Sequence, residues 1–140
     1  SQKNWFQQNI NPNDKHLLLF MNDKIIGYNV LRIKKLKIYY KHKIILQNCY
    51  LFDTLILNQK YRNCGLSKMI TNKSNLIIKD KNYYSFLVCL KKLVSYYRKF
   101  HWNLIPKNKI MFTDHVKTNK KAMFYGKNLN LKKIKKIRII

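Results

Sequence analysis

The chain has 140 residues and a mass of 17.1 kDa, which suits one domain with a single core and is too little for two ordinary domains. Hydrophobic residues make up 46% of it, which excludes a disordered chain because this much apolar surface offsets the entropy of folding. The net charge of +25 should attract anionic ligands, such as a phosphate-bearing cofactor, a nucleotide-sugar or RNA.

The charged residues have an unusual composition. Four of the 30 basic residues are Arg, which leaves 26 Lys, and the five acids are all Asp. A genome rich in A and T favours Lys, Asn, Ile and Tyr, so codon bias explains part of the Lys excess. The same bias would favour Glu, however, and the chain has none. Codon bias and a functional positive field therefore both remain open as explanations.

The cysteines and the apolar runs limit the compartment. Cys49, Cys64 and Cys89 are odd in number and lack CxxC spacing, so the sequence predicts no zinc or other metal site and no disulfide framework. The longest apolar runs are far too short to span a membrane, and no signal peptide opens the chain. We therefore expect a soluble cytoplasmic protein with reduced thiols. Ser1 in place of a start Met is consistent with a trimmed N-terminus.

The first part of the chain predicts three antiparallel strands. Residues 5–10 are typical of the end of a short helix, and the Pro and Asn cluster of residues 11–14 marks a turn. Apolar runs over residues 16–21 and 25–33, separated by a polar turn, predict a β-hairpin. Residues 44–57 are too many for a flat strand, so this strand should bend or bulge.

Two strand and helix units should follow. Residues 61–65 interrupt the strand pattern, and from Leu66 the apolar residues recur at helical spacing. Residues 84–89 are aromatic and branched, as is typical of a strand, and residues 93–100 again show a helical pattern that ends before Pro106. The middle of the chain is therefore α/β.

The last part predicts two strands and a basic tail. Residues 109–113 and 122–125 fit strands joined by a polar turn over residues 114–121. The tail, residues 129–140, carries apolar residues at helical spacing among basic ones. As a helix it would be basic and amphipathic and able to lie on a membrane surface or RNA, but the favoured interpretation is an added edge strand or a solvated tail.

The stretch from Asp53 to Ser67 carries the clearest chemical signal, because a branched strand leads through a turn into a helix. Free backbone N–H groups and the positive end of the helix dipole attract a phosphate at such a helix start. Gly65 lets the backbone approach the phosphate without a Cβ in the way. A single glycine before a helix is more often a packing or turn residue, so this pattern alone does not decide.

Residues 57–67, LNQKYRNCGLS, resemble the cofactor loop of the GCN5-related N-acetyltransferases (GNAT), which reads Arg/Gln-x-x-Gly-x-Gly/Ala after a strand. Arg62 and Gly65 fit this motif, whereas Ser67 replaces a Gly or Ala and Asn63 a common Gly. Gln59 stands where the family usually has Pro. The resemblance implies that the chain binds an acyl-CoA, first of all acetyl-CoA, as co-substrate. The implied cofactor-binding residues are Leu55, Ile56, Leu57, Arg62, Asn63, Cys64, Gly65, Leu66 and Ser67.

Residues 86–102, FLVCLKKLVSYYRKFHW, resemble a second family segment, a strand followed by a helix that ends in Phe-Tyr-x-x-x-Gly-Phe/Trp. His101 replaces the usual Gly, so the exit of this helix should differ locally. The two segments cover about half the chain. They imply an α/β fold with a mixed, mostly antiparallel central sheet flanked by helices, in which the family's first strand and first helix are reduced or missing.

The resemblance also implies a mechanism, in which the amine attacks the thioester directly. Tyr97 matches the Tyr that protonates the CoA thiolate, although a role as an aromatic core residue remains open. A backbone N–H near Leu57 would stabilise the oxyanion. Asp53 replaces the usual Glu as candidate base, on the same strand face as Leu55 and Leu57.

Other bases and other functions stay open at this stage. Of His42, His101 and His115, only His101 is close in sequence to the presumed site, and a chain of waters would also suffice as base. The family segments favour an amine on a small molecule such as an amino sugar. The alternatives are acetyl transfer to tRNA or another RNA as in the acetyltransferase toxins, a basic nucleic-acid-binding module, and an acyl-CoA sensor without turnover. A homodimer is also compatible with the sequence.

Overall fold

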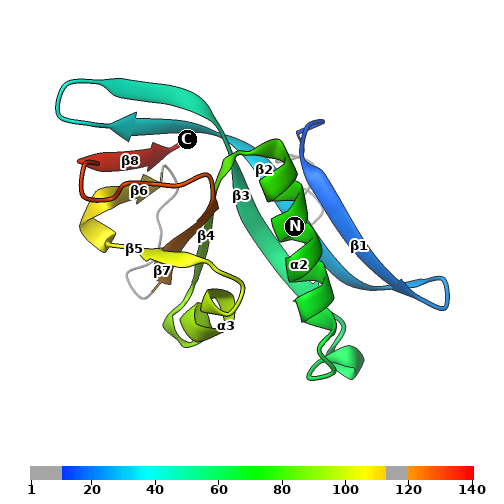
Figure 1. Ribbon diagram of the computed structural model, residues 1–140. Coiled ribbons are helices and arrows are strands. Elements are labelled where there is room, and N and C mark those ends of the chain that lie inside the picture. Colours follow the sequence, from blue (N-terminus) through cyan, green and yellow to red (C-terminus); the bar gives the residue numbers. More distant parts are fainter. Residues whose placement is uncertain (1–10, 113–119) are drawn as a thin grey trace, which may run out of the picture.

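The computed structural model describes residues 11–112 and 120–140, and all eight of its strands belong to one mixed sheet (Figure 1). The order is β5-β7-β4-β3-β2-β8-β6, and β1 also pairs with β2. β3 with β4 and β6 with β8 are parallel pairs, and the other pairs are antiparallel. The strands are β1 Lys15–Met21, β2 Lys24–Tyr39, β3 Ile44–Leu57, β4 Tyr84–Leu90, β5 Asn103–Ile105, β6 Ile110–Phe112, β7 Lys120–Gly126 and β8 Lys136–Ile139.

Two helices accompany the sheet. α2 spans Leu66–Lys81 and α3 spans Val94–Arg98, and three short 3-10 turns, η1 Gln59–Tyr61, η2 Lys91–Leu93 and η3 Lys107–Lys109, lie between strands. The mixed, mostly antiparallel sheet with flanking helices is the fold that the sequence predicts. The helix end expected over residues 5–10 lies outside the described residues.

The strand β2 is longer than predicted. It was expected to end at residue 33, but it continues to Tyr39 and pairs with β3 along this extension. In the sequence, the Lys residues among residues 34–37 obscure the apolar pattern that predicts a strand. Leu36 and Ile38 are fully buried, so the period-two pattern of a strand continues through the Lys-rich segment.

The predicted irregularity of β3 is a bulge at Thr54. Leu55 pairs with Asn29 and Asp53 pairs with Val30, so Thr54 is left over, with a φ of 54°. The side chain of Asn29, which is fully buried, holds the bulge in place. Its Nδ2 donates to the carbonyl oxygens of Asp53 at 3.1 Å and Thr54 at 3.2 Å, and its Oδ1 accepts from Ser74 Oγ of α2 at 2.6 Å.

The helix α2 packs against β2 through a residue without a side chain. A Cβ at Gly27 would lie 2.7 Å from Ile70 Cδ1, so a larger residue here would require the end of the Ile70 side chain to shift. Asn75 joins α2 to the exit of α3, because its Nδ2 donates to Phe100 O and its Oδ1 accepts from Trp102 Nε1. These contacts fix α2 relative to β2 and to the exit of α3.

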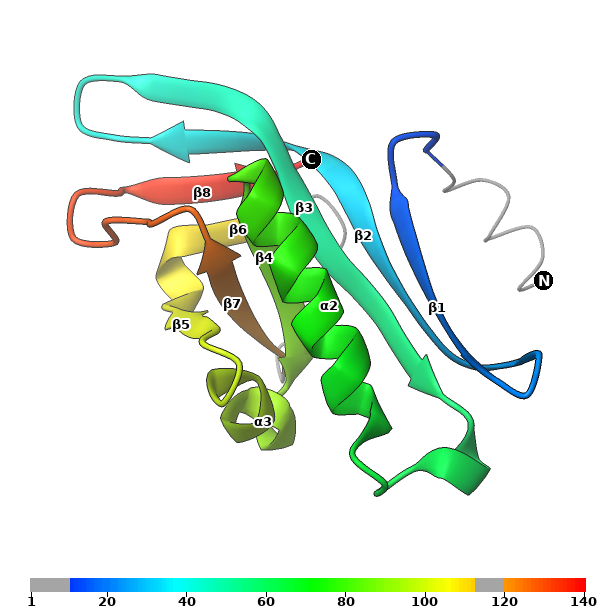
Figure 2. The same ribbon diagram turned by 45° about the vertical axis from the view of Figure 1, so that its right-hand side comes forward.

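The end of the chain confirms one prediction and corrects another. The tail adds a strand and is not a helix, because residues 136–139 form β8, but β8 lies in the interior of the sheet, between β2 and β6, and not at its edge (Figure 2). Residues 109–113 and 122–125 do not form a hairpin: β6 pairs with β8, and β7 pairs with β4 and with β5, a strand that the sequence pattern did not indicate. The sheet closes over a second core that includes Ile134, Ile137 and Ile139.

Candidate active site

The site begins where two parallel strands separate. β3 and β4 pair only over Cys49–Leu51 and Tyr84–Phe86, although β3 continues to Leu57 and β4 to Leu90. In Figure 2, β3 leads away from β4 toward η1, and α3 lies beyond the end of β4. The bulge at Thr54 bends β3 within this unpaired part. The carboxyl ends of the two strands therefore border an open gap.

A cavity of about 370 Å³ lies in this gap. It brings together residues from β3, from the loop before α2 and from α3. Its lining residues are Leu55, Ile56, Leu57, Arg62, Asn63, Ser67, Leu93, Tyr96 and Tyr97. Seven of these are predicted site residues, so the two sequence segments that carry the family resemblance meet at one place. Cys64, Gly65 and Leu66 lie in the loop between lining residues.

The loop before α2 leaves its backbone open to a ligand. Asn63 and Gly65 have φ values of 64° and 74°, the left-handed region that Asn and Gly tolerate best. Arg62 Nε donates to Leu57 O at 3.1 Å and closes the loop onto the end of β3. No side chain caps α2, and a Cβ added to Gly65 would meet no atom within 4 Å. The first N–H groups of α2 therefore face open space, as a phosphate site requires.

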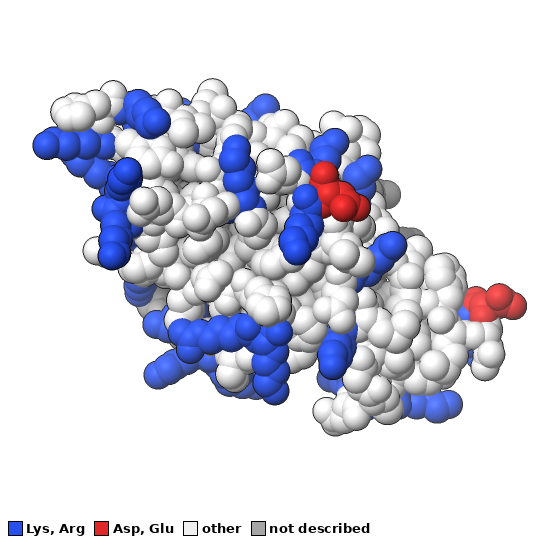
Figure 3. All heavy atoms as spheres, in the orientation of Figure 1, with Lys and Arg blue, Asp and Glu red and all other residues white. Residues whose placement is uncertain are grey.

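Exposed basic residues lie on the elements that border the cavity on both sides, and we call them the basic rim. Lys60, Arg62 and Lys68 are exposed on the η1 and α2 side. Lys91, Lys92 and Arg98 are exposed on the η2 and α3 side, and Figure 3 shows basic atoms gathered where Figure 1 draws α3. None of the four described acids lines the cavity. The local field therefore favours a ligand with several negative charges.

The two tyrosines of α3 differ in their bonding. The hydroxyl of Tyr96 hydrogen-bonds Ser67 Oγ at 3.0 Å and Thr71 Oγ1 at 3.2 Å, which ties α3 to α2. Tyr97 is buried and packs edge-on against Phe52, and within the described residues no protein group hydrogen-bonds its hydroxyl. Burial, together with the neighbouring Tyr96, raises the pKa of Tyr97 well above its ordinary value. Its hydroxyl therefore stays protonated at neutral pH.

Comparison with known proteins identifies the architecture. No protein-family model and no curated protein match the sequence. Among solved structures, a putative GNAT acetyltransferase from Bacteroides thetaiotaomicron has 16% identity and a TM-score of 0.62 over 94% of this chain and 71% of its own. A GNAT acetyltransferase from Elizabethkingia anophelis with acetyl-CoA bound has 14% identity and a TM-score of 0.61 over 89% and 82%. A GNAT acetyltransferase from Staphylococcus aureus has 16% identity and a TM-score of 0.59 over 86% of this chain and 73% of its own. The chain has the GNAT fold.

Within this GNAT fold, a backbone N–H at the end of β3 points into the gap. Asn58 N donates to Ile26 O of β2 at 2.7 Å. Because successive N–H groups of a strand point to opposite edges, the N–H of Leu57 points away from β2 and toward β4. The carbonyl of Leu57 is already bound by Arg62. The N–H of Leu57 therefore points into the gap, and its role as oxyanion donor stays a prediction.

Asp53 does not share a face with Leu55 and Leu57, contrary to the expectation from simple alternation. The bulge at Thr54 inserts one residue, so Asp53 lies opposite Val30 while Leu55 lies opposite Asn29 on the α2 side. Asp53 therefore points to the sheet face away from α2. There Arg32 Nε donates to Asp53 Oδ2 at 2.7 Å, and Asp14 lies 3.6 Å from the same guanidinium.

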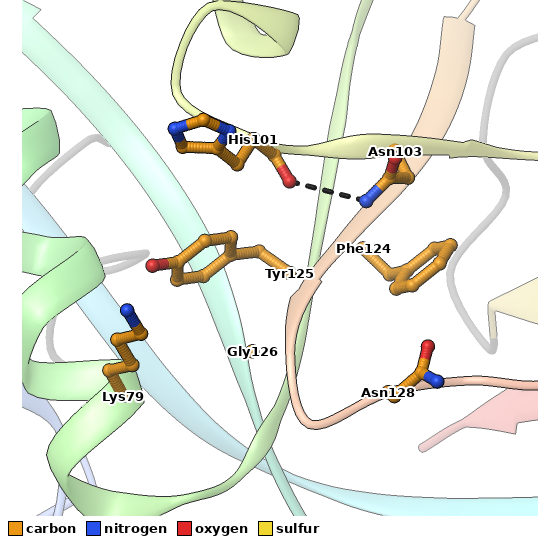
Figure 4. Close-up of a pocket in the computed structure, with 7 residues that line it drawn as sticks. All are labelled: Lys79, His101, Asn103, Phe124, Tyr125, Gly126 and Asn128. Atoms are coloured by element: carbon orange, nitrogen blue, oxygen red, sulfur yellow. Dashed lines mark hydrogen bonds between the residues drawn. The ribbon is translucent and has the colours of Figure 1, made fainter.

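Of the three candidate histidines, the two that the structure describes lie away from the cavity of Tyr97. His42 lies in the β2–β3 turn, at the opposite end of β3 from Leu57, and His115 is outside the described residues. His101 lines a second cavity of about 280 Å³ with Lys79 and Tyr125, whose polar ends point into the same space in Figure 4. Its φ of 68° lies in the left-handed region, which Gly tolerates better than His.

Two residues that support the site were not identified from the sequence. Asn29 and Ser74 form the link between the β3 bulge and α2. The sequence could have indicated them, because each is a polar residue on the apolar face of a predicted element. A buried amide or hydroxyl needs a hydrogen-bond partner. Within the described residues the structure shows no group of three or more metal-ligating side chains and no helix long and apolar enough to cross a membrane.

Proposed function

We propose that this chain is an acyl-CoA-dependent N-acyltransferase that transfers acetyl from acetyl-CoA to a primary amine. The observation that carries the proposal is the gap between β3 and β4, which opens onto both the uncapped start of α2 and the free hydroxyl of Tyr97. A pyrophosphate at the helix start and a thioester in the gap would occupy these two ends. Bound acetyl-CoA in the Elizabethkingia anophelis structure, which shares the fold, supports this choice of co-substrate.

The residues of the cavity fit the parts of an acyl-CoA. The N–H groups that follow Gly65 would hold the pyrophosphate, and the basic rim would balance its charge. Leu55, Leu57 and Leu93 offer an apolar wall to the pantetheine arm. The N–H of Leu57 would donate to the thioester oxygen as negative charge develops on it.

Tyr97 would donate a proton or hydrogen bond to the leaving sulfur. Its raised pKa keeps the hydroxyl in the donating form, while the same raised pKa opposes complete ionisation of the phenol. Tyr97 would therefore stabilise the thiolate as a hydrogen-bond donor that keeps its own proton, and the thiolate would take its proton from solvent. The bond that forms is the amide, the bond that breaks is the thioester, and the amine loses a proton to a base.

We infer that Asp53 acts as base only for an amine that approaches from the sheet face away from α2. Its carboxylate lies on that face, and its side chain is 35% exposed despite the bond to Arg32. A small-molecule amine such as an amino sugar remains the proposed acceptor. The basic rim disfavours a polycation at the cavity mouth.

A pair of substitutions at Gly65 tests the proposal. Asn and Asp both tolerate the positive φ of this residue, and Asp at a helix N-cap stabilises the helix. Gly65→Asn should raise the dissociation constant of acetyl-CoA about tenfold, and Gly65→Asp at least about tenfold more, equivalent to about 1.4 kcal/mol. Isothermal titration measures binding, and thermal unfolding should show no loss of stability for Gly65→Asp.

Turnover separates an enzyme from a sensor. The wild-type protein should release CoA thiol from acetyl-CoA when an accepted amine is added, and a panel of amino sugar, peptide and aminoacyl-tRNA amines identifies the acceptor class. Equal acetyl-CoA affinity in the wild type and both Gly65 variants would remove the loop from the site. Saturable binding without thiol release for any amine would assign the chain as a sensor.

A further inference from the structure

The extension of the β2–β3 hairpin forms a flat, basic sheet face that the acyl-CoA site does not use. Beyond Ile33, β2 pairs with β3 on one side and with β8 on the other, and β6 pairs with β8. Figure 1 shows this end of the hairpin projecting past α2 together with β8. We call it the basic sheet face, and its residues are Lys35, Lys37, Tyr39, Ile44, Leu46, Asn48, Met111, Lys136 and Arg138.

The strand register places these side chains on one side of the sheet. Lys37 pairs with Leu46 and with Arg138, and Tyr39 pairs with Ile44 and Lys136. Directly paired residues share a face, so these side chains stand together. The intervening residues Leu36 and Ile38 are fully buried in the second core, so the basic sheet face is the outer one.

The exposed apolar residues of this face are large. Ile44 and Leu46 are 61% and 64% exposed, and Met111 is 44% exposed. In the row Leu46, Lys37, Arg138 and Met111, two cations lie between two apolar side chains. A membrane that buried the apolar side chains would also have to bury the two cations between them, which is unfavourable. A single-stranded nucleic acid can contact both, because its phosphates pair with the cations and its bases pack on the apolar side chains.

The cations of the face are available to an anionic ligand. Lys35 Nζ donates to Asn48 Oδ1 at 3.0 Å, but both ion pairs of the described residues involve Arg32, which lies elsewhere. No described acid belongs to the face. In Figure 3 the left part of the molecule, where Figure 1 draws the hairpin end and β8, shows basic atoms and no acidic ones.

We infer that the basic sheet face binds single-stranded nucleic acid. Lys37, Lys136 and Arg138 contact phosphates, and the ring of Tyr39 stacks on a base with Ile44 and Leu46 beside it. An open sheet face with a ring and cations suits unpaired bases better than a duplex, whose bases are stacked inside. This binding is independent of acetyl transfer.

Two double variants with equal charge test the inference. Lys37→Gln/Arg138→Gln removes two cations from the face, and Lys24→Gln/Lys73→Gln removes two exposed cations elsewhere. Fluorescence anisotropy follows a labelled single-stranded RNA of roughly 12 nucleotides over a salt series. The face variant should reduce the slope of log affinity against log salt by about 1.4, because each single-strand phosphate contact contributes about 0.7. The control should keep the wild-type slope.

Tyr39 tests stacking separately from charge. Tyr39→Ala should weaken RNA binding about fivefold to a hundredfold at unchanged salt slope, and Tyr39→Leu, which keeps apolar packing, should weaken it similarly. Acetyl-CoA affinity in these variants should stay at the wild-type value, which shows that they fold and that the two sites are separate. Equal slopes for the two double variants would assign RNA binding to diffuse charge and overturn the inference. Loss of binding to anionic phosphatidylserine vesicles, with RNA binding intact, would assign the face to a membrane instead.

Discussion

The bulge of β3 depends on a single buried amide, and Asn29→Ala should reveal what this amide does. The substitution removes three hydrogen bonds, two from Nδ2 to the carbonyls of Asp53 and Thr54 and one from Ser74 Oγ to Oδ1. A buried hydrogen bond contributes about 1 kcal/mol net, so the free energy of unfolding should fall by about 3 kcal/mol. Ser74→Ala removes only one of the three bonds and should cost about 1 kcal/mol.

The same substitution should affect the site. Without Asn29 the bulge loses its support, and β3 is free to pair more regularly and narrow the gap toward β4. The dissociation constant of acetyl-CoA should therefore rise at least about tenfold in Asn29→Ala and change much less in Ser74→Ala. Urea unfolding measures the first effect and isothermal titration the second. Wild-type unfolding midpoint and wild-type affinity in Asn29→Ala would refute the reasoning, and lost stability with unchanged affinity would limit Asn29 to a structural role.

Three further predictions concern individual side chains. Tyr97→Phe should keep acetyl-CoA binding and lower kcat at least about a hundredfold. Tyr96→Phe, which loses only its hydrogen bonds to α2, should keep most of the wild-type kcat. Equal kcat in the two variants would remove Tyr97 from the chemistry. Asp53→Asn should lower kcat, and Asp14→Asn, which leaves the Asp53 carboxylate in place, should keep most of the wild-type kcat; equal kcat in both variants would remove Asp53 from the chemistry. Cys64 is exposed and should be the cysteine that reacts with iodoacetamide at pH 8, because burial raises the pKa of Cys49 to about 12. Bound acetyl-CoA should protect Cys64 from this reaction. Modification of Cys49 in the folded protein would contradict its burial.

The sequence predicts the cofactor half of the fold because its signals there are local. Apolar spacing places α2 and β4, and Gly65 with its neighbours marks the loop between β3 and α2. Asn63 and His101 stand where the family motif has Gly, and both have a positive φ, the region that Gly tolerates best. Local chemistry is enough where a residue's conformation depends on its immediate neighbours.

The remaining parts depend on contacts between distant residues. The Lys-rich end of β2 pairs with β3 on one side, and on the other side it pairs with β8, which lies about a hundred residues later and supplies Ile137 and Ile139 to the same core. β6 and β7 resemble a hairpin in the sequence, but their partners are β8, β4 and β5. Strand propensity identifies such segments without specifying their partners.

The bulge at Thr54 has a further consequence for how two substrates would meet. It reverses the facing of β3, so the cavity with Leu55 and Leu57 opens on the α2 side while Asp53 faces the other side. Because β3 and β4 are unpaired beyond Leu51, no strand pairing closes the space between the two faces. An acyl-CoA seated on the α2 side would then present its thioester to an amine from the other side. The basic rim would then lie beside the phosphates of the acyl-CoA, and Asp53 would lie beside the amine. The inserted residue Thr54 thus separates the positive surface that the cofactor needs from the negative group that the amine needs.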